Sequence, residues 1–259
     1  MADLSTPHAA LAWFRAWGRA GRFALAAAAA ALSRSTYTAE MRAVALRQIY
    51  FTAWQVLAGF TLFAAFLSLV TIQITVSAAR SFGLADYALE LVFRVLVLEL
   101  LPFGTALLVA LRSGSALSTE VALMHASGEL DAMRSAGIDP LRSEFVPRVI
   151  AAALSVFSLT VITCAVALAL AYLAMYGLSP WGFGAYTRAI ALVFDLPSFT
   201  GFVLKCIAFG VVVAAIPIAA GIDATRELKS APVAVMGGMV RLFLALGLIE
   251  VLSLAVKYV

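Results

Sequence analysis

The chain has 259 residues, of which 64% are hydrophobic and only 12% are charged, and its net charge at pH 7 is +4. Soluble domains carry about twice this share of charged residues, so the composition and a mean hydropathy of +1.02 exclude an ordinary soluble domain and indicate an integral membrane protein. The positive charge comes largely from the first fifty residues and includes no basic run interleaved with aromatic residues, which favours contact with anionic lipid over nucleic acid.

The N-terminal stretch 11–32 is apolar, but charged residues interrupt it too often for a membrane span. Arginines recur in it at spacings of four and three residues, on one helical face, with aromatic residues beside them: Arg15, Arg19, Arg22, Trp13, Phe14 and Trp17. We therefore predict an amphipathic helix that lies in the membrane interface, and assign residues 1–50 to a cytoplasmic, interfacial region. A secretory signal peptide is the alternative for this stretch.

Five later stretches are long and apolar enough to cross a bilayer, which takes about 20 helical residues. They cover residues 54–77, 88–111, 151–176, 199–221 and 236–256. All five are expected to be helices, because a lone strand leaves its backbone groups unpaired in lipid. Residues 51–259 are thus predicted to form one all-α transmembrane domain, with Cys164 and Cys206 as buried free thiols.

The loops between these stretches differ in their content of basic residues. Basic residues are numerous before the first span, between the second and third, and after the fourth: Arg15, Arg19, Arg22, Arg34, Arg42 and Arg47; then Arg112, Arg134, Arg142 and Arg148; then Arg226 and Lys229. The two remaining loops hold Arg80 and Arg188 alone. This alternation predicts an N-inside, C-outside topology with the loop between spans two and three in the cytoplasm.

That cytoplasmic loop contains the segment GELDAMRSAGIDPLR, residues 128–142, which is far more polar than its surroundings. Ser127 is suited to cap a helix whose first turn holds Glu129 and Asp131, where the helix dipole favours anions. Asp131 and Arg134 are spaced as an i,i+3 ion pair, and Gly137 is suited to end the helix in the left-handed conformation. The sequence therefore predicts a short capped helix beside the membrane.

A second short helix is predicted directly after the first. Asp139 and Pro140 are typical of the N-cap and first position of a helix. On the residues alone, the helix pair is either an ordinary solvated loop or a docking element for a soluble partner. Both readings stay open at this point.

Ionisable side chains inside the predicted spans are costly and therefore point to function. Arg94 and Glu99 fall on span two, Lys205 on span four and Glu250 on span five. We expect Lys205, near the outer end of its span, to snorkel towards the headgroups. Glu99 is expected to face a cavity, in contact with a lipid headgroup or with Arg94, while Pro102 is expected to kink span two.

The stretch LRSGSALSTEVALMHASGELDAMRSAGIDPLRSEFVPR, residues 111–148, resembles the signature region of the MlaE family of ABC-transporter permeases. Residues in matching places are Arg112, Gly114, Ser115, Ala116, Glu120, Met124, Asp131, Ala132, Asp139, Pro140, Pro147 and Arg148. Three departures indicate a divergent member. The family's Thr-Glu-Gln triplet is replaced by residues 127–129, the arginine and glycine expected near Glu99 are missing, and a Thr-rich motif is not visible in residues 231–243.

The resemblance implies a homodimeric permease of a multi-pass lipid transporter in the cell inner membrane. Such permeases work with a cytoplasmic ATP-binding subunit, an MCE-domain lipid-binding protein and often a STAS-domain subunit, and they move phospholipids between the inner membrane and the MCE protein, which contributes to outer-membrane lipid asymmetry. The loop between spans two and three is then the coupling helix inserted into the ATPase. The residues assigned to coupling are Glu129, Leu130, Asp131, Met133, Arg134, Asp139 and Pro140; family-motif positions are Arg112, Gly114, Ser115, Glu120, Pro147 and Arg148; and Arg94, Glu99 and Pro102 are assigned to a lipid cavity.

No cofactor or metal is expected, and the chain is not expected to be an enzyme. The sequence contains no G-x-x-x-x-G-K-[ST] motif, so any energy from ATP must come through a separate subunit. Its two histidines, His8 and His125, lack neighbours at metal-ligand spacing. The alternatives to a permease are an integral-membrane enzyme acting on lipids and a structural membrane subunit without a transport path.

Overall fold

A computed structural model describes residues 7–33, 37, 39–84, 87–224 and 231–258. Arg34, Arg226 and Lys229, which contribute to the charge count above, lie outside these residues. Within the described ranges the chain forms helices joined by short turns and contains no strand. The predicted all-α fold is therefore confirmed.

Five of the helical stretches are long and apolar enough to cross a membrane. They run over Met41–Ser81, Ala88–Ala126, Leu141–Tyr176, Leu196–Ile222 and Val235–Lys257. Each contains one predicted span. The first three extend well beyond it at one or both ends, because the helices continue into polar regions, whereas the last two exceed it by one to three residues at each end. The five-span prediction is confirmed, while the orientation of the spans stays a prediction.

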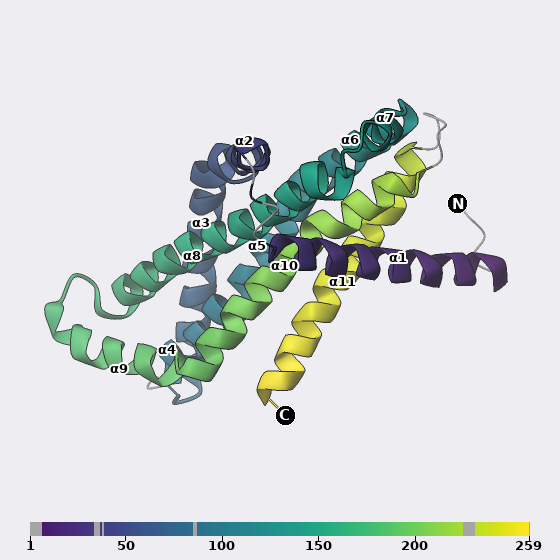
Figure 1. The fold of residues 1–259 in the computed structure, drawn as a ribbon. Helices are drawn as coiled ribbons and strands as arrows, with labels where there is room; N and C mark the ends of the chain where they lie inside the picture. The colour runs from purple at the N-terminus through teal and green to yellow at the C-terminus, as the bar shows by residue number, and fades with distance from the viewer. Residues whose placement is uncertain (1–6, 34–36, 38, 85–86, 225–230, 259) are drawn as a thin grey trace.

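The long helices are built from shorter elements in chain order (Figure 1). The first span joins α2 (Ala39–Ile49), the π-helical η2 (Tyr50–Trp54) and α3 (Gln55–Ser81). The second span joins three α-helices, α4 (Ala88–Leu91), α5 (Leu101–Val109) and α6 (Ser115–Ala126), through two π-helical segments, η4 (Val92–Leu100) and η5 (Ala110–Gly114). After the short α7 (Glu129–Ser135), the third span joins the π-helical η6 (Leu141–Phe145) and α8 (Val146–Tyr176). A 3-10 turn, η7 (Pro180–Gly182), and α9 (Phe183–Val193) lead to α10 (Leu196–Ile222), and α11 (Ala231–Tyr258) is the last helix.

The N-terminal helix α1 (Pro7–Ala31) is not one of the five candidate spans and lies across the bundle over α10 (Figure 1). Ala20 and Ala27, seven residues apart, are buried against the bundle, whereas Arg15 and Arg22 are exposed. Arg19 forms an ion pair of 2.9 Å with Asp223 at the end of α10. The helix has the two-sided character predicted for it, and its position in the membrane interface stays a prediction.

Span two changes its helical pitch where Pro102 interrupts the hydrogen bonding. In the π-helical η4 the N–H of Leu101 donates to the carbonyl of Leu96, five residues back. Proline has no N–H and would clash with the preceding turn of an α-helix, so a wider turn before Pro102 accommodates its ring.

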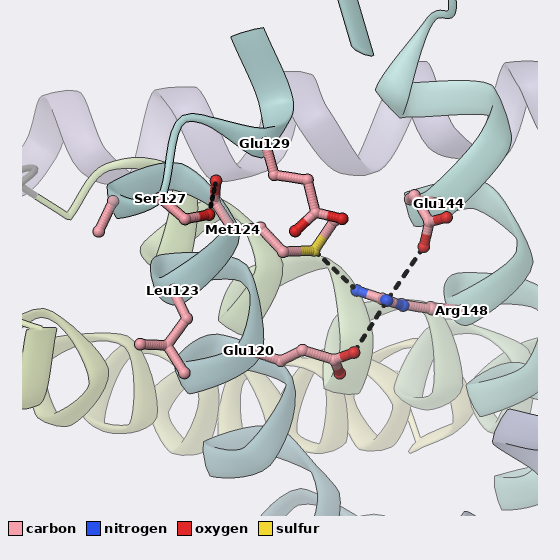
Figure 2. A pocket seen from close by; sticks show the side chains of 8 residues that line it. Glu120, Leu123, Met124, Ser127, Glu129, Glu144 and Arg148 are labelled. Atoms are coloured by element: carbon pink, nitrogen blue, oxygen red, sulfur yellow. Dashed lines mark hydrogen bonds and ion pairs between the residues drawn. The ribbon is translucent and has the colours of Figure 1, made fainter. Parts of the chain in front are cut away.

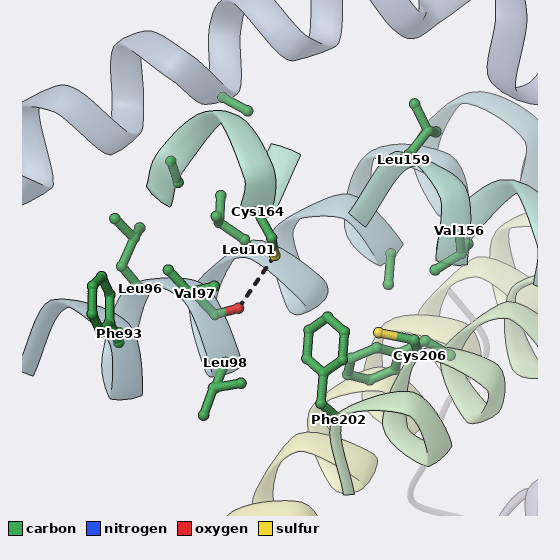
Figure 3. Packing of buried hydrophobic residues seen from close by; sticks show 14 of the residues in the cluster. Phe93, Leu96, Val97, Leu98, Leu101, Val156, Leu159, Cys164, Phe202 and Cys206 are labelled. Carbon is green, nitrogen blue, oxygen red and sulfur yellow. Dashed lines mark hydrogen bonds between the residues drawn. The ribbon is translucent and has the colours of Figure 1, made fainter. Parts of the chain in front are cut away.

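The apolar core includes η4, α5, α8 and α10, part of which Figure 3 shows, together with buried residues of α3, α9 and α11. Phe93, Leu98, Leu159 and Phe209 are among its fully buried side chains. The thiol of Cys164 lies 3.5 Å from the carbonyl oxygen of Val97, and Cys206 is also buried and free. The prediction of buried free thiols is confirmed.

Helices α8 and α10 approach each other without side chains between them. A Cβ atom added at Gly210 of α10 would overlap the Cα of Ala153 on α8 and lie 3.0 Å from its nitrogen. Only glycine permits this approach, so the two spans are packed backbone to backbone at this level.

Candidate functional site

The turn between α6 and α7 differs from the predicted one. Gly128, with φ of 78°, is the residue that precedes α7, and the Ser127 hydroxyl donates to the carbonyl of Met124 at 3.2 Å instead of capping α7. The prediction of Ser127 as N-cap is therefore wrong. Because α6 ends at Ala126, the chain must reverse within two residues, and this requires a left-handed glycine at position 128.

The rest of α7 agrees with its local pattern. Arg134 donates to Asp131 at 3.2 Å, and Gly137 ends the segment with φ of 76°. Leu130 is 1% exposed and packs with the buried cluster that includes Leu117 and Val146, whereas most neighbouring polar side chains face outward. The short helix is thus anchored on one side by an apolar residue and presents charges on the other.

The second predicted short helix is instead the beginning of span three. The Asp139 carboxylate accepts the backbone N–H of Leu141 at 3.0 Å, as expected for a cap. The helix that begins there continues to Tyr176, because the residues after Arg148 form an uninterrupted apolar run. Asp139 and Pro140 therefore join α7 directly to a membrane-spanning helix.

Two family-motif residues, Glu120 and Arg148, meet beside α7. Arg148 is 7% exposed, and its guanidinium donates to Glu120 on α6 and to Glu144 on η6, each at 3.0 Å (Figure 2). The sulfur of Met124 lies 3.8 Å from the same guanidinium. We call Arg148, Glu120 and Glu144 the Arg148 cluster.

A cavity of about 540 Å³ opens next to the Arg148 cluster, and Glu129 of α7 also lines it (Figure 2). Two carboxylates therefore contact one arginine where spans two and three meet the α7 loop, and a third, Glu129, lines the same cavity. The cluster ties span two to span three at the base of this loop.

The remaining motif residues have packing roles. Arg112 donates to the side-chain oxygen of Gln55 at 3.0 Å, which links span two to span one. A Cβ atom at Gly114 would lie 3.2 Å from side chains of Leu242 and Met239, so this glycine keeps span five close. Ser115 is half-buried at the start of α6, and Pro147 is buried in the first turn of α8.

A second polar cluster lies among spans two, four and five, towards the ends of the spans that are away from α7. The Lys205 ammonium on α10 contacts the Glu99 carboxylate on η4 and lies 3.4 Å from Glu250 on α11. Lys257 on α11 donates to the other Glu99 oxygen at 2.8 Å. We call Glu99, Lys205, Glu250 and Lys257 the Lys205 cluster.

The structure corrects two predictions about these charges. Lys205 is 5% exposed and paired within the bundle, so it does not snorkel alone towards the headgroups. Arg94 pairs with Glu90, four residues away on the same span, at 2.9 Å, and not with Glu99, whose carboxylate is held by Lys205 and Lys257 instead. Lys257 was missed, although its spacing of seven residues from Glu250 places both on one face of α11.

A cavity of about 670 Å³ is open beside the Lys205 cluster. Its walls include Arg94 and Glu99 together with Lys205, Lys257 and apolar residues of α10 and α11; that the cavity binds lipid stays a prediction. Pro102 is buried but does not line this cavity. At its rim, the Asp195 carboxylate caps α10 by accepting the N–H of Ser198 at 3.1 Å, and hydrogen bonds from Ser198 hold the pKa of this carboxyl below its ordinary value.

Among the described residues, no group of three or more His, Cys, Asp or Glu side chains is placed to hold a metal ion. The arrangement offers two buried sets of paired charges, one beside the α7 loop and one beside a cavity within the spans. Each set can bind a charged group, and each couples the movement of the spans that its ion pairs join.

Comparison with known proteins gives a family match over most of the chain. Residues 45–256 match the family described as Permease MlaE. The chain is 38% identical over 95 residues to the Intermembrane phospholipid transport system permease protein MlaE of Haemophilus influenzae, covering 37% of this chain and 34% of that protein. It is 39% identical over 84 residues to Protein TRIGALACTOSYLDIACYLGLYCEROL 1, chloroplastic, of Arabidopsis thaliana, covering 31% and 24%.

A third relative is a probable ABC transporter permease protein of Synechocystis sp., 29% identical over 154 residues, or 57% of each chain. The matched stretches thus span about a third, a quarter and just over half of the lengths of these three relatives.

Proposed function

The chain belongs to the MlaE permease family and is a multi-pass protein of the inner membrane, and from this premise we propose that it is the membrane permease subunit of an ABC-type phospholipid transporter. It moves lipids between the inner membrane and an MCE-domain protein and so contributes to outer-membrane lipid asymmetry. The name of the Haemophilus relative, a permease of an intermembrane phospholipid transport system, supports this substrate class.

The observation that carries the proposal is the cavity beside the Lys205 cluster. Charged side chains within membrane spans are expensive, and a purely structural bundle has no need of four of them at one place. Two ammonium groups suit a lipid phosphate, and two carboxylates suit a cationic headgroup amine. The apolar side chains of the same cavity, among them Phe202, Leu252 and Val256, suit acyl chains.

Energy enters from a separate cytoplasmic ATP-binding subunit, because the chain carries no phosphate-binding P-loop. In this proposal α7 is the coupling helix that docks on that subunit. The Arg148 cluster supports the assignment, since it links the base of the α7 loop to spans two and three. The proposed assembly is a homodimer with the ATP-binding subunit, the MCE-domain protein and a STAS-domain subunit.

Lipid transfer by the reconstituted complex tests the proposal. Glu99→Ala removes the carboxylate that both lysines contact, and we expect transfer of phospholipid to the MCE protein to fall several-fold while the complex still assembles. Asp223→Ala is the control, because Asp223 pairs with Arg19 at the other end of α10 and does not line the cavity. Normal transfer by the assembled Glu99→Ala complex would contradict the proposal, as would failure of the chain to copurify with an ATP-binding subunit.

A further inference from the structure

The segment between spans three and four is fixed at the opposite face of the membrane from α7. Span three runs from Leu141 to Tyr176 and span four begins at Leu196. Because α7 precedes span three and η7 and α9 follow it, a whole bilayer separates the two connections. Figure 1 shows α9 at the end of the bundle away from α7.

One face of α9 is held firmly against the spans. Tyr186 is buried, and its hydroxyl donates to the carbonyl of Leu168 on α8 at 2.6 Å. Its ring makes edge contacts with Phe93 at 5.5 Å and with Tyr172 at 5.1 Å between centroids. Val193, two turns further along, is 1% exposed. The helix therefore has a defined orientation.

The opposite face of this segment is apolar and unusually exposed. Trp181 is 92% exposed and Leu178 is 91% exposed, and four other large apolar side chains extend the same surface: Phe183, Leu192, Leu196 and Phe199. An apolar groove of about 640 Å³ lies between α8 and α9, lined by residues that include Tyr172, Leu173 and Phe183. This surface is too large and too apolar to face water without cost.

The charges of the segment indicate what covers it. Residues 177–195 contain one arginine, Arg188, which is exposed, and one acidic residue, Asp195, whose carboxylate caps the start of α10. Tryptophan and tyrosine are favoured at the depth of lipid headgroups, where arginine meets phosphate. Leu173 on α8 is exposed and lines the same groove as Leu178 and Phe183, so the apolar surface extends onto the adjoining span, whose exposed apolar residues face the bilayer in a membrane-spanning bundle.

We propose that η7 and α9 form a membrane-interface anchor in the leaflet opposite α7. Trp181 and Leu178 insert below the headgroups, an acyl chain of that leaflet fills the groove between α8 and α9, and Arg188 contacts the phosphate of an anionic lipid. The occupant of this surface is the bilayer itself and not a partner protein.

Spin labelling of the full chain in vesicles tests the anchor. Trp181→Cys can be labelled selectively because Cys164 and Cys206 are buried. In vesicles of phosphatidylcholine and phosphatidylglycerol, we expect the label to be several-fold more accessible to oxygen than to a water-soluble nickel chelate. Ile138→Cys, an exposed apolar position after α7, is the matched control and should show the reverse preference.

Leu178→Cys gives an independent measurement if Trp181→Cys does not fold, and it should show the same preference for oxygen. Arg188→Gln should weaken the dependence of the label's depth on phosphatidylglycerol. Free access of nickel to the labels at 181 and 178 in vesicles would overturn the proposal. Protection from nickel that appears only after an MCE-domain protein is added would also overturn it, in favour of a protein contact.

Discussion

The Arg148 cluster and the Lys205 cluster both place a buried cation between carboxylates, but they differ in how far their acids reach water. The Arg148 side chain is 8% exposed, while its partners Glu120 and Glu144 are 54% and 25% exposed. In the Lys205 cluster no side chain is more than 20% exposed. A carboxylate of the first cluster reaches bulk water if its partner is lost, whereas the carboxylates of the second stay within the bundle, 10% and 14% exposed.

Because of this difference in exposure, we expect the two clusters to respond differently to an approaching charged group. The Arg148 cluster can exchange partners with groups that approach from the solution, as a junction beside a docking loop requires. The Lys205 cluster is balanced internally, with two ammonium groups against two carboxylates, so a ligand that enters its cavity must replace an existing pair.

Lys205→Met should have the largest effect on stability. It leaves Glu99 and Glu250 buried with only Lys257 nearby, and breaking a buried pair in this way costs about 3–5 kcal/mol. Unfolding of the purified chain in mixed detergent micelles measures the loss. The double variant Lys205→Met/Glu250→Gln removes one carboxylate as well and should recover part of it; no recovery would mean that packing, and not charge, governs this site.

Arg148→Gln should have an intermediate effect of about 1–3 kcal/mol, because Glu120 and Glu144 lose a charged donor but keep access to water. The same unfolding measurement applies. Arg148→Lys keeps the charge but lacks the forked donor geometry that reaches two acids, so its loss should be smaller than that of the glutamine variant. A loss as large as that of Lys205→Met would erase the distinction between the clusters.

Charge reversal on α7, Glu129→Lys with Asp131→Lys, should cost about 1 kcal/mol or less, because both side chains reach water although Asp131 loses its pair with Arg134. Lipid-stimulated ATP hydrolysis by the partner subunit should nevertheless fall several-fold in the reconstituted complex. Arg80→Glu, in the loop predicted on the opposite face, is the control and should leave hydrolysis unchanged. Unchanged hydrolysis in the α7 variant would show that α7 does not couple the permease to the ATP-binding subunit.

Arg94→Gln should have the smallest effect, about 0.3–0.5 kcal/mol, because its partner Glu90 lies one turn away and both are partly exposed. A double-mutant cycle with Glu90→Gln isolates this pair. A coupling energy as large as that of the Lys205 cluster would show that Arg94 also contributes to the buried charge balance.

Features that depend on residues close in sequence could be predicted. Apolar runs set the five spans, and spacing set the Asp131–Arg134 pair and the left-handed Gly137. The prediction that Ser127 caps α7 was wrong, because the geometry of the turn depends on where α6 ends and not on the capping tendency of Ser127. The pairing of Glu99 with Lys205 and Lys257 joins three helices, and the rotation of each helix about its axis depends on packing of small residues that the sequence pattern does not determine.

The backbone contact of Gly210 with Ala153 lies between the Arg148 cluster and the Lys205 cluster along the bundle. Ala153 lies five residues along α8 from Arg148, and Gly210 lies five residues along α10 from Lys205, about 7–8 Å in each case. Since consecutive spans run in opposite directions, the contact lies between the two charged sites, with no compressible side chain at the crossing. The contact is therefore a fixed pivot between the two helices: if α10 tilts about it relative to α8, Lys205 on one side of the contact and the end of α10 on the Arg148 side move in opposite directions relative to α8.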